Sequence, residues 1–487
     1  MSTIAAISTP FGRGGIAVIR ISGENALKVA EKMFITACGL DLSEVEGGRA
    51  VYGRIVSDGE QIDDGIATVF CAPRSFTGED TVEISCHGGI LLTERVLKTA
   101  FDCGALPAEP GEFTQRVFMN GKIDLSGAEA VIGLIDAENE EKLRLCASHA
   151  SGVLKKRCDS IFERILHLVS SVYVKLDYPE EDLAEVSDRE FAKELGEIIR
   201  LLSETEATYK HGKAVAEGVK TAIIGKPNTG KSSLLNALVG EEKAIVTSVA
   251  GTTRDVIEEK INAGKVTLRL FDTAGIRASA DEVERIGIER ALAKADEAEL
   301  IIALFDATKM PDEQDERIMS IIKDACRAKK PLIYALNKID AADENAVLAI
   351  RGAIKRAVDE AFSEADILTS PNEIRLPTSC GEINAVHISA KTGEGVDELK
   401  KLAEAFFCEG DINYRDVAVV ANARQHAAIC EAKNAVKRAL MAFESGMGAD
   451  VCGLDLEAAI AALGQIDGRS VSDKVTDQIF HNFCVGK

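Results

Sequence analysis

Gly225-Lys-Pro-Asn-Thr-Gly-Lys-Ser232 stands between an apolar run, Thr221 to Ile224, and a helical pattern that begins at Ser233. A G-x-x-x-x-G-K-S sequence binds phosphate when strand, loop and helix follow in this order. Loop N–H groups and the helix N-terminus then face the β-phosphate, Lys231 reaches the β- and γ-phosphates, and the Ser232 hydroxyl can ligate Mg²⁺. A chance match is the alternative, and the flanking strand and helix disfavour it. The stretch predicts a nucleotide-binding α/β domain.

Three further motifs follow in the order typical of a GTPase. Asp272-Thr-Ala-Gly275 comes after an apolar strand and offers a carboxylate to Mg²⁺, through water, and a glycine N–H to the γ-phosphate. Asn337-Lys-Ile-Asp340 closes another strand, where Asp340 can accept from N1–H and the N2 amine of guanine, which adenine lacks. Ser389-Ala-Lys391 is expected to bring the Ala390 N–H to guanine O6. Together these motifs predict GTP rather than ATP as the ligand.

Gly251-Thr-Thr-Arg-Asp255 lies between the first two motifs and offers Thr253 as a second Mg²⁺ hydroxyl in a switch segment. A surface turn rich in Gly and Thr is the alternative. The predicted GTP-binding residues are Asn228, Thr229, Gly230, Lys231, Ser232, Ser233, Thr247, Ser248, Val249, Ala250, Gly251, Thr252, Thr253, Asp272, Thr273, Ala274, Gly275, Asn337, Lys338, Asp340, Ser389, Ala390 and Lys391.

The pattern of apolar residues changes three times along the 487 residues. Residues 1–120 mix β-like and helical segments and predict an α+β domain, whereas 121–217 are helical almost throughout. Residues 218–410 alternate strands and helices, which predicts a mostly parallel sheet, and 411–487 return to helix. The simplest architecture is a Ras-like P-loop domain inserted into a helical domain and preceded by the α+β domain.

Composition limits the classes of partner and location. The chain has 57 Lys and Arg against 79 Asp and Glu, a formal charge of −22, so it repels a phosphate backbone unless its basic residues cluster. Its twelve cysteines form no C-x-x-C pair, which disfavours zinc knuckles and favours a reducing cytoplasm. The N-terminus lacks a signal-peptide pattern, and no apolar run is long enough for a membrane span. We therefore expect a cytoplasmic protein without membrane contact.

The motif order G-x-P-N-x-G-K-S, G-T-T-R-D and D-T-A-G resembles the TrmE–Era–EngA branch of P-loop GTPases, and within it the MnmE family of tRNA-modification GTPases. The resemblance extends over the whole chain. It includes Pro10-Phe-Gly-Arg-Gly-Gly15, Cys86-His-Gly-Gly89, Asp177-Tyr-Pro-Glu-Glu181 and the final Cys484-Val-Gly-Lys487. It implies that the N-terminal α+β domain resembles tetrahydrofolate-binding domains and forms a constitutive homodimer.

The resemblance also implies a hydrolytic mechanism. Ile276, after D-T-A-G, is apolar and cannot orient the attacking water, so Glu284 in Asp281-Glu-Val-Glu-Arg-Ile-Gly-Ile288 is implied to do so. A K⁺ ion would replace an arginine finger when G domains dimerise. Its implied ligands are Asn228, Thr247, Val249 and Thr252. Without the family, Glu284 reads as an exposed carboxylate at a helix start.

Folate contacts and a tail thiol complete the implied sites. Arg20, Glu83, Lys122 and Lys487 match the family's contacts to 5-formyl- or 5,10-methylene-tetrahydrofolate. Glu83 could pair with the pterin edge, and cations could hold the glutamate tail. From sequence alone, however, Arg20 on a strand is more often a salt-bridge partner. Cys484 could be a catalytic thiol, with an inert tail as the alternative.

The resemblance implies work with the FAD-containing partner MnmG, in a heterotetramer, to install a carboxymethylaminomethyl or aminomethyl group at C5 of wobble uridine 34 in certain tRNAs. Most tRNA contacts would then belong to the partner. Two alternatives stay open. A ribosome-assembly or regulatory switch GTPase predicts a basic RNA-binding appendage, and a folate carrier with a vestigial GTPase predicts damaged phosphate-loop residues.

Overall fold

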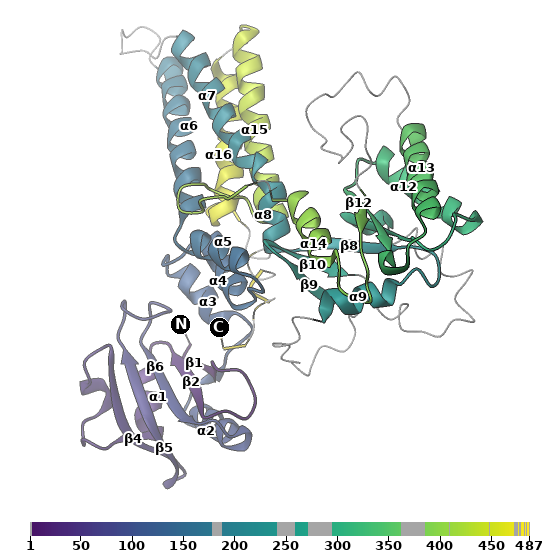
Figure 1. The fold of residues 1–487 in the computed structure, drawn as a ribbon. Helices are drawn as coiled ribbons and strands as arrows, with labels where there is room; N and C mark the ends of the chain where they lie inside the picture. Colours follow the sequence, from purple (N-terminus) through teal and green to yellow (C-terminus); the bar gives the residue numbers. More distant parts are fainter. Residues whose placement is uncertain are drawn as a thin grey trace. The chain divides into compact units, whose positions relative to one another are not determined.

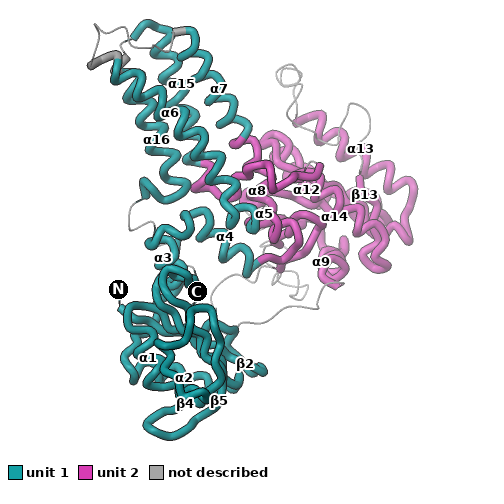
Figure 2. Tube along the Cα trace, turned by 90° about the vertical axis from the view of Figure 1, so that its left-hand side faces the viewer, with its two compact units in different colours: residues 1–136, 146–204, 427–487 teal, residues 137–145, 205–426 magenta. Residues whose placement is uncertain are grey.

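The computed structural model describes residues 2–177, 188–240, 259–270, 295–361, 385–408, 410–447, 449–471, 476, 479–481, 483 and 485–486. The chain folds into two compact units, which Figure 1 and Figure 2 show. Unit 1 comprises residues 1–136, 146–204 and 427–487. Unit 2 comprises residues 137–145 and 205–426, so it interrupts unit 1 in the sequence.

The N-terminal part of unit 1 is a seven-stranded sheet in the order β3-β4-β5-β6-β2-β1-β7. The strands are β1 (Ile4–Ile7), β2 (Ile16–Ser22), β3 (Phe34–Thr36), β4 (Arg49–Ser57), β5 (Glu60–Phe70), β6 (Thr81–His87) and β7 (Leu106–Pro107). Side chains alternate between the two faces of a strand. Ile19 and Ile84 therefore enter the core on one face, while Arg20 and Glu83 lie on the other.

Two helices close the apolar face of this sheet, α1 (Ala26–Met33) and α2 (Ile90–Asp102). Met33 of α1 and Val96 of α2 are fully buried there with Ile19 and Ile84. The short helix η1 (Leu42–Glu44) and α3 (Glu112–Met119) complete this part of the chain. Polar side chains, among them Arg20 and Glu83, lie on the opposite face of the sheet.

The rest of unit 1 is helical. Its helices are α4 (Leu125–Ile135), the second half of α5 (Glu140–Ala150), α6 (Val153–Asp177), α7 (Asp188–Ala207), α15 (Ala423–Glu444) and α16 (Ala449–Asp467). Figure 1 shows α6, α7, α15 and α16 running side by side as a bundle. Aromatic packing of Phe191 against Phe443, with ring centroids 4.9 Å apart, ties α7 to α15. The two predicted helical halves, far apart in sequence, thus form one bundle.

Unit 2 contains a six-stranded sheet in the order β13-β12-β11-β8-β10-β9. Its strands are β8 (Val219–Ile224), β9 (Glu259–Ala263), β10 (Val266–Leu270), β11 (Leu300–Asp306), β12 (Leu332–Asn337) and β13 (Val386–His387). All neighbouring strands are parallel except β9, which pairs antiparallel with β10 at the sheet edge. Every residue of β11 is buried, as expected for a strand covered on both faces.

Helices cover both faces of this sheet. On one face lie α12 (Glu313–Arg327) and α13 (Glu344–Ala361), and on the other lie α8 (Tyr209–Ala216), α9 (Lys231–Val239) and α14 (Val396–Ala405). A short helix, η2 (Ile339–Ala341), follows β12. In such sheets ligands bind at the carboxyl ends of the strands. The loops after β8, β12 and β13 therefore meet at one edge. Within the described ranges, no helix is both long and apolar enough to cross a bilayer.

Candidate functional site

The phosphate loop runs from the end of β8 to the start of α9. It has a glycine near each end, Gly225 and Gly230, where the backbone lies close to neighbouring residues. A Cβ on Gly225 would lie 2.6 Å from the Leu304 carbonyl oxygen, so a side chain there would collide with β11. Gly230 has φ +97°, and a Cβ on it would lie 2.2 Å from Asn337 Nδ2. Only glycine allows both approaches. These contacts explain why the motif needs glycines at these two positions.

Lys231, the first residue of α9, folds its side chain back over this loop. Its Nζ donates to the carbonyl oxygens of Gly225, at 2.7 Å, and Lys226, at 2.8 Å. Burial lowers the pKa of Lys231 from 10.5 to about 8. A phosphate anion would attract this partly desolvated ammonium group more strongly than the two neutral carbonyls that it contacts here.

Asn337 and Lys338, at the end of β12, fasten the base-recognition loop to the phosphate loop. Asn337 Nδ2 donates to the Thr229 carbonyl at 2.7 Å, and its Oδ1 accepts from the Ala390 N–H at 2.9 Å. Lys338 Nζ donates to the Asn228 carbonyl at 2.9 Å. Three loops, separated by up to about 160 residues in sequence, are thus joined around one site.

The Asp340 carboxylate lies beside the third of these loops. Ser389 Oγ, fully buried, donates to Asp340 Oδ1 at 2.8 Å. This bond fixes the orientation of the carboxylate and leaves its second oxygen and remaining lone pairs available to a ligand. Ala390 is buried and Lys391 is exposed. The sequence predicted that these motifs lie together, and the hydrogen bonds join the loops after β8, β12 and β13.

Several predicted site residues lie outside the described residues. They are Thr247, Ser248, Val249, Ala250, Gly251, Thr252, Thr253, Asp272, Thr273, Ala274, Gly275, Glu284, Cys484 and Lys487. Ser232 and Ser233 are described and occupy the first turn of α9, directly after Lys231. The roles of all these residues remain predictions.

Arg20 and Glu83, predicted to contact folate, face each other across β2 and β6 on the polar face of the N-terminal sheet. Arg20 Nε donates to Glu83 Oε1 at 2.8 Å, and a second guanidinium nitrogen lies 2.7 Å from the same oxygen. The guanidinium also lies over the rings of Phe76, at 5.1 Å, and Phe113, at 5.6 Å. The salt-bridge reading of Arg20 is thus observed, and the aromatic surround adds a flat, partly apolar surface beside it.

Lys122 and the loop before β6 lie next to this pair. Lys122 Nζ donates to the carbonyl oxygens of Pro73, at 3.2 Å, and Ser75. Ser75 directly precedes Phe76, whose ring faces Arg20. The structure therefore brings three of the four predicted folate residues to one region.

The described part of the C-terminal tail contacts the N-terminal sheet. Val485 forms an isolated antiparallel bridge with Pro110, and Ser8 Oγ donates to the Gly486 carbonyl at 3.1 Å. A Cβ on Gly486 would lie 2.1 Å from the Ile7 carbonyl, so only glycine fits there. The tail is therefore seated at the end of β1.

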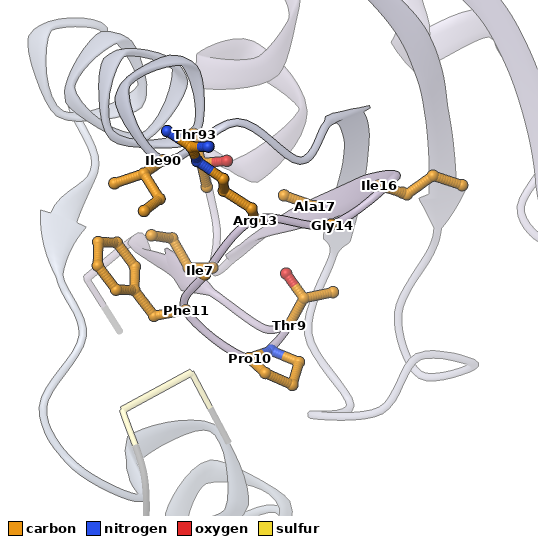
Figure 3. A pocket seen from close by; sticks show the side chains of 11 residues that line it. Ile7, Thr9, Pro10, Phe11, Arg13, Gly14, Ile16, Ala17, Ile90 and Thr93 are labelled. Carbon is orange, nitrogen blue, oxygen red and sulfur yellow. The ribbon is translucent and has the colours of Figure 1, made fainter. Parts of the chain in front are cut away.

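A pocket of about 370 Å³, which the sequence did not predict, opens near the end of β1 (Figure 3). Arg13, Ile90 and Thr93 gather at one end of it, by the start of α2, and Phe11 flanks it. Backbone bonding of Gly14 N to the Gly88 carbonyl, at 2.9 Å, holds its loop. The lining residues are Ile7, Thr9, Pro10, Phe11, Gly12, Arg13, Gly14, Ile16, Ala17, Ile90 and Thr93. The glycine-rich run 10–15, which supplies several of these residues, was the feature of the sequence that could have indicated a pocket here.

Asp306 is a second residue that sequence reasoning missed. Its buried carboxylate lies 2.6 Å from Lys338 Nζ and accepts from Thr308. Burial acts to raise the pKa of Asp306, but the hydrogen bonds from Lys338 and Thr308 outweigh it and keep the pKa below its usual value. Asp306 therefore holds Lys338 beside the phosphate loop. An acidic residue at the end of a buried strand was the only sequence signal.

The fold and the site define a multidomain GTPase. An α+β domain comes first in the sequence, and a helical domain with an inserted P-loop domain follows it. Residues 3–122 match the family model described as GTP-binding protein TrmE N-terminus, and residues 125–484 match the MnmE helical domain. The tRNA modification GTPase MnmE of Acetivibrio thermocellus is 38% identical over 487 residues, covering 100% of this chain and 99% of that protein. The MnmE of Levilactobacillus brevis is 39% identical, covering 100% and 98%. The chain belongs to the MnmE family of tRNA modification GTPases.

Solved structures give shorter matches. A single-residue variant of Aquifex aeolicus Era bound to GDP·AlF4⁻ is 29% identical and covers 45% of this chain and 66% of its own, with a TM-score of 0.24. The G domain of the T. maritima FeoB iron transporter is 28% identical and covers 38% of this chain and 97% of its own, with a TM-score of 0.23.

Proposed function

We propose that this member of the MnmE family hydrolyses GTP and couples the cycle to modification of wobble uridine 34 in certain tRNAs. The full-length similarity to MnmE proteins carries the proposal, since both the N-terminal and helical parts match the family. The hydrogen-bonded arrangement of Lys231, Asn337 and Asp340 supports it, because phosphate and guanine recognition need these groups at one edge of the sheet.

Roles in the GTP site follow from side-chain chemistry. Lys231 would bind the β- and γ-phosphates, and Asp340 would accept from the guanine N1–H and N2 amine. Hydroxyl oxygens of Ser232 and Thr253, with Asp272 through water, suit Mg²⁺, which neutralises phosphate charge when bound. Asn228, Thr247, Val249 and Thr252 offer oxygen donors for K⁺. Glu284 would orient the attacking water once two G domains associate.

A tetrahydrofolate derivative would bind on the polar face of the N-terminal sheet. Glu83 could accept from the amino-pyrimidine edge of a pterin, and the Phe76 ring offers a surface for stacking. Arg20, which is paired with Glu83, would hold that carboxylate in place beside the pterin, and Lys122 and Lys487 would supply positive charge for the glutamate carboxylates. Cys484 is assigned to this chemistry only as a candidate thiol. The domain boundaries 1–120, 121–217, 218–410 and 411–487 belong to the same proposal.

The partner would be MnmG, which carries FAD, in a heterotetramer with a homodimer of this chain. Together they would transfer the one-carbon unit and build the carboxymethylaminomethyl or aminomethyl group. A net charge of −22 supports the proposal that the partner makes most of the tRNA contacts, because a strongly acidic chain repels the RNA phosphates. The complex would act on tRNA in the cytoplasm.

The function is tested by nucleoside mass spectrometry of tRNA from cells that lack this chain. Restoring the chain should restore the modified wobble uridine, and a Lys231→Ala variant should not, although it accumulates to the same level. Unmodified uridine after restoration of the wild-type chain would contradict the proposal and favour a regulatory or ribosome-assembly GTPase.

Folate binding should depend on the Arg20 and Glu83 pair. Glu83→Gln keeps the shape but removes the charge that holds Arg20, so we expect about tenfold weaker binding of 5-formyl-tetrahydrofolate, as for loss of one charged hydrogen bond. Isothermal titration of the full chain measures it. Glu60→Gln, at the exposed start of β5, is the control. Equal affinity of the Glu83 variant and the wild type would remove Glu83 from the site.

Nucleotide affinity should fall at alkaline pH because of Lys231. In the free protein burial lowers its pKa to about 8, whereas a bound phosphate requires the charged form. Above pH 8 binding must therefore take up a proton, and the GDP Kd should rise about tenfold per pH unit, while below pH 8 this group adds no dependence. Titration calorimetry in two buffers of different ionisation enthalpy measures both affinity and proton uptake. A flat Kd between about pH 7 and 9.5 would contradict the assignment.

A further inference from the structure

Lys226, the second residue of the phosphate loop, points its charge away from the loop and into the start of α12. Its Nζ lies 2.5 Å from Asp315 Oδ2 and 2.9 Å from Asp312 Oδ2. The side chains of Lys226 and Asp315 are only 8% and 5% exposed, whereas that of Asp312 is 55% exposed. The GTP contacts proposed above do not involve this nearly buried ion pair.

Both carboxylates are held in place by the first turn of α12. Asp312 is the N-cap, and its Oδ1 accepts from the N–H groups of Gln314, at 3.0 Å, and Asp315, at 3.2 Å. Asp315 Oδ2 in turn accepts from the Asp312 N–H at 3.0 Å. This reciprocal capping box fixes the acceptors that face Lys226.

The charge on Lys226 persists in this buried position. Burial acts to lower its pKa, but the hydrogen bonds to Asp315 and Asp312 outweigh burial and raise the pKa. The ammonium group therefore links the loop to α12 in its charged form.

The backbone carbonyl of Lys226 connects the ion pair to the phosphate-binding residues. Its carbonyl oxygen accepts from Lys231 Nζ at 2.8 Å and from Thr229 Oγ1 at 2.9 Å. Thr229 is fully buried, and its own carbonyl accepts from Asn337. A shift of the Lys226 backbone would thus move the resting place of the phosphate-binding lysine and the turn that leads to Gly230.

We propose that Lys226 is a positioning residue for nucleotide binding: its ion pair with Asp312 and Asp315 clamps the phosphate loop to α12 in the shape that receives the phosphates. It contacts no reacting atom and acts through its own carbonyl and through Thr229. This inference rests on the proposed GTP binding and adds α12 to the parts of the domain that set affinity. Any displacement of the first turn of α12 would reach the phosphates through this clamp.

The competing explanation is that the pair only stabilises the fold. Breaking a buried ion pair by removing one partner costs about 3–5 kcal/mol of stability, whereas replacing both partners by apolar residues of similar volume is often neutral. Lys226→Met leaves Asp315 charged and unpaired, but Lys226→Met with Asp315→Asn leaves no buried charge and keeps a side-chain acceptor for the Asp312 N–H. The double variant therefore separates stability from loop position.

The experiment measures two quantities on the full chain, the GDP Kd by displacement of a fluorescent analogue and the thermal midpoint without nucleotide. We expect the double variant to keep a midpoint near that of the wild type and yet bind GDP at least about tenfold more weakly. Asp312→Ser retains an N-cap oxygen but removes one carboxylate. It should also raise the GDP Kd, by a smaller factor than the double variant, and leave the thermal midpoint unchanged.

Lys213→Met is the control, because Lys213 forms an ion pair with Glu299 in the same unit. Glu299 accepts from the Lys220 N–H at the start of β8, whereas the phosphate loop follows the end of that strand. It should leave the GDP Kd unchanged. Wild-type GDP affinity in both the double and Asp312→Ser variants, or an equal loss in Lys213→Met, would overturn the clamp. Failure of the wild-type chain itself to bind GDP would instead reject the proposed function.

Discussion

Glu284→Ala is expected to bind GTP with wild-type affinity and to lose hydrolysis by a factor of about 10²–10⁴, the usual contribution of a general base or water-orienting group. Ile276 leaves the position after D-T-A-G without a polar group, so the attacking water needs another partner. Glu284 lies outside the described residues, and its assignment comes from the resemblance of Asp281-Glu-Val-Glu-Arg-Ile-Gly-Ile288 to the family segment.

Single-turnover hydrolysis and fluorescent GTP-analogue binding, measured on the same preparation in KCl, separate the two effects. Glu282→Ala is a matched control, since it removes a carboxylate two residues away. It should hydrolyse GTP at the wild-type rate. Normal turnover in Glu284→Ala would show that another residue orients the water.

Asp340→Asn is expected to lose guanine affinity by at least about 100-fold, because two charge-assisted hydrogen bonds, to N1–H and the N2 amine, are lost together. Ser389 Oγ already holds Asp340 Oδ1, so the new amide would be oriented at the same place. Xanthine carries an oxygen at C2, which an amide N–H can donate to. The variant should therefore prefer xanthosine diphosphate over GDP.

Competition of GDP and xanthosine diphosphate for the site measures this preference. Asp343→Asn is the control, because Asp343 Oδ1 accepts from the N–H groups of Asn345 and Ala346 at the start of α13 and is not assigned to the base. It should keep guanine selectivity. Retained guanine selectivity in Asp340→Asn would refute the base assignment.

Much of the architecture could be predicted from local sequence. Apolar runs bounded by glycine or polar residues predicted β8 and β12, since a buried parallel strand is apolar along its whole length. Helical periodicity predicted the two segments that meet in the bundle of unit 1. The inserted position of the α/β domain followed from the return of helix after residue 410, and the interruption of unit 1 by unit 2 confirms it.

Other elements gave too little local signal. Helix α16 (Ala449–Asp467) lies in the stretch 411–487 that was predicted to be helical, but its bounds were not predicted. It buries Cys452, Leu456 and Leu463 and is so rich in alanine that no single apolar stripe stands out. The two-residue strand β7 (Leu106–Pro107) exists only because β1 offers it a partner. Such elements depend on tertiary contacts that a single sequence does not reveal.

The candidate site divides in the same way. The motif residues Lys231, Asn337 and Asp340 were predicted because spacing and strand order encode them. Their supports were not, since Lys226 and Asp312 are 86 positions apart and Lys338 and Asp306 are 32 apart. An isolated charge in a sequence carries no information about which distant charge it will meet.

The decisive measurement is GTP hydrolysis by the purified full chain in KCl and in NaCl at equal ionic strength. G-domain association is followed in parallel, in the presence of GDP and a transition-state mimic. We expect hydrolysis that depends strongly on K⁺ and is accompanied by association. Hydrolysis that is indifferent to the cation and proceeds without association would contradict the MnmE-type mechanism and favour a regulatory switch GTPase.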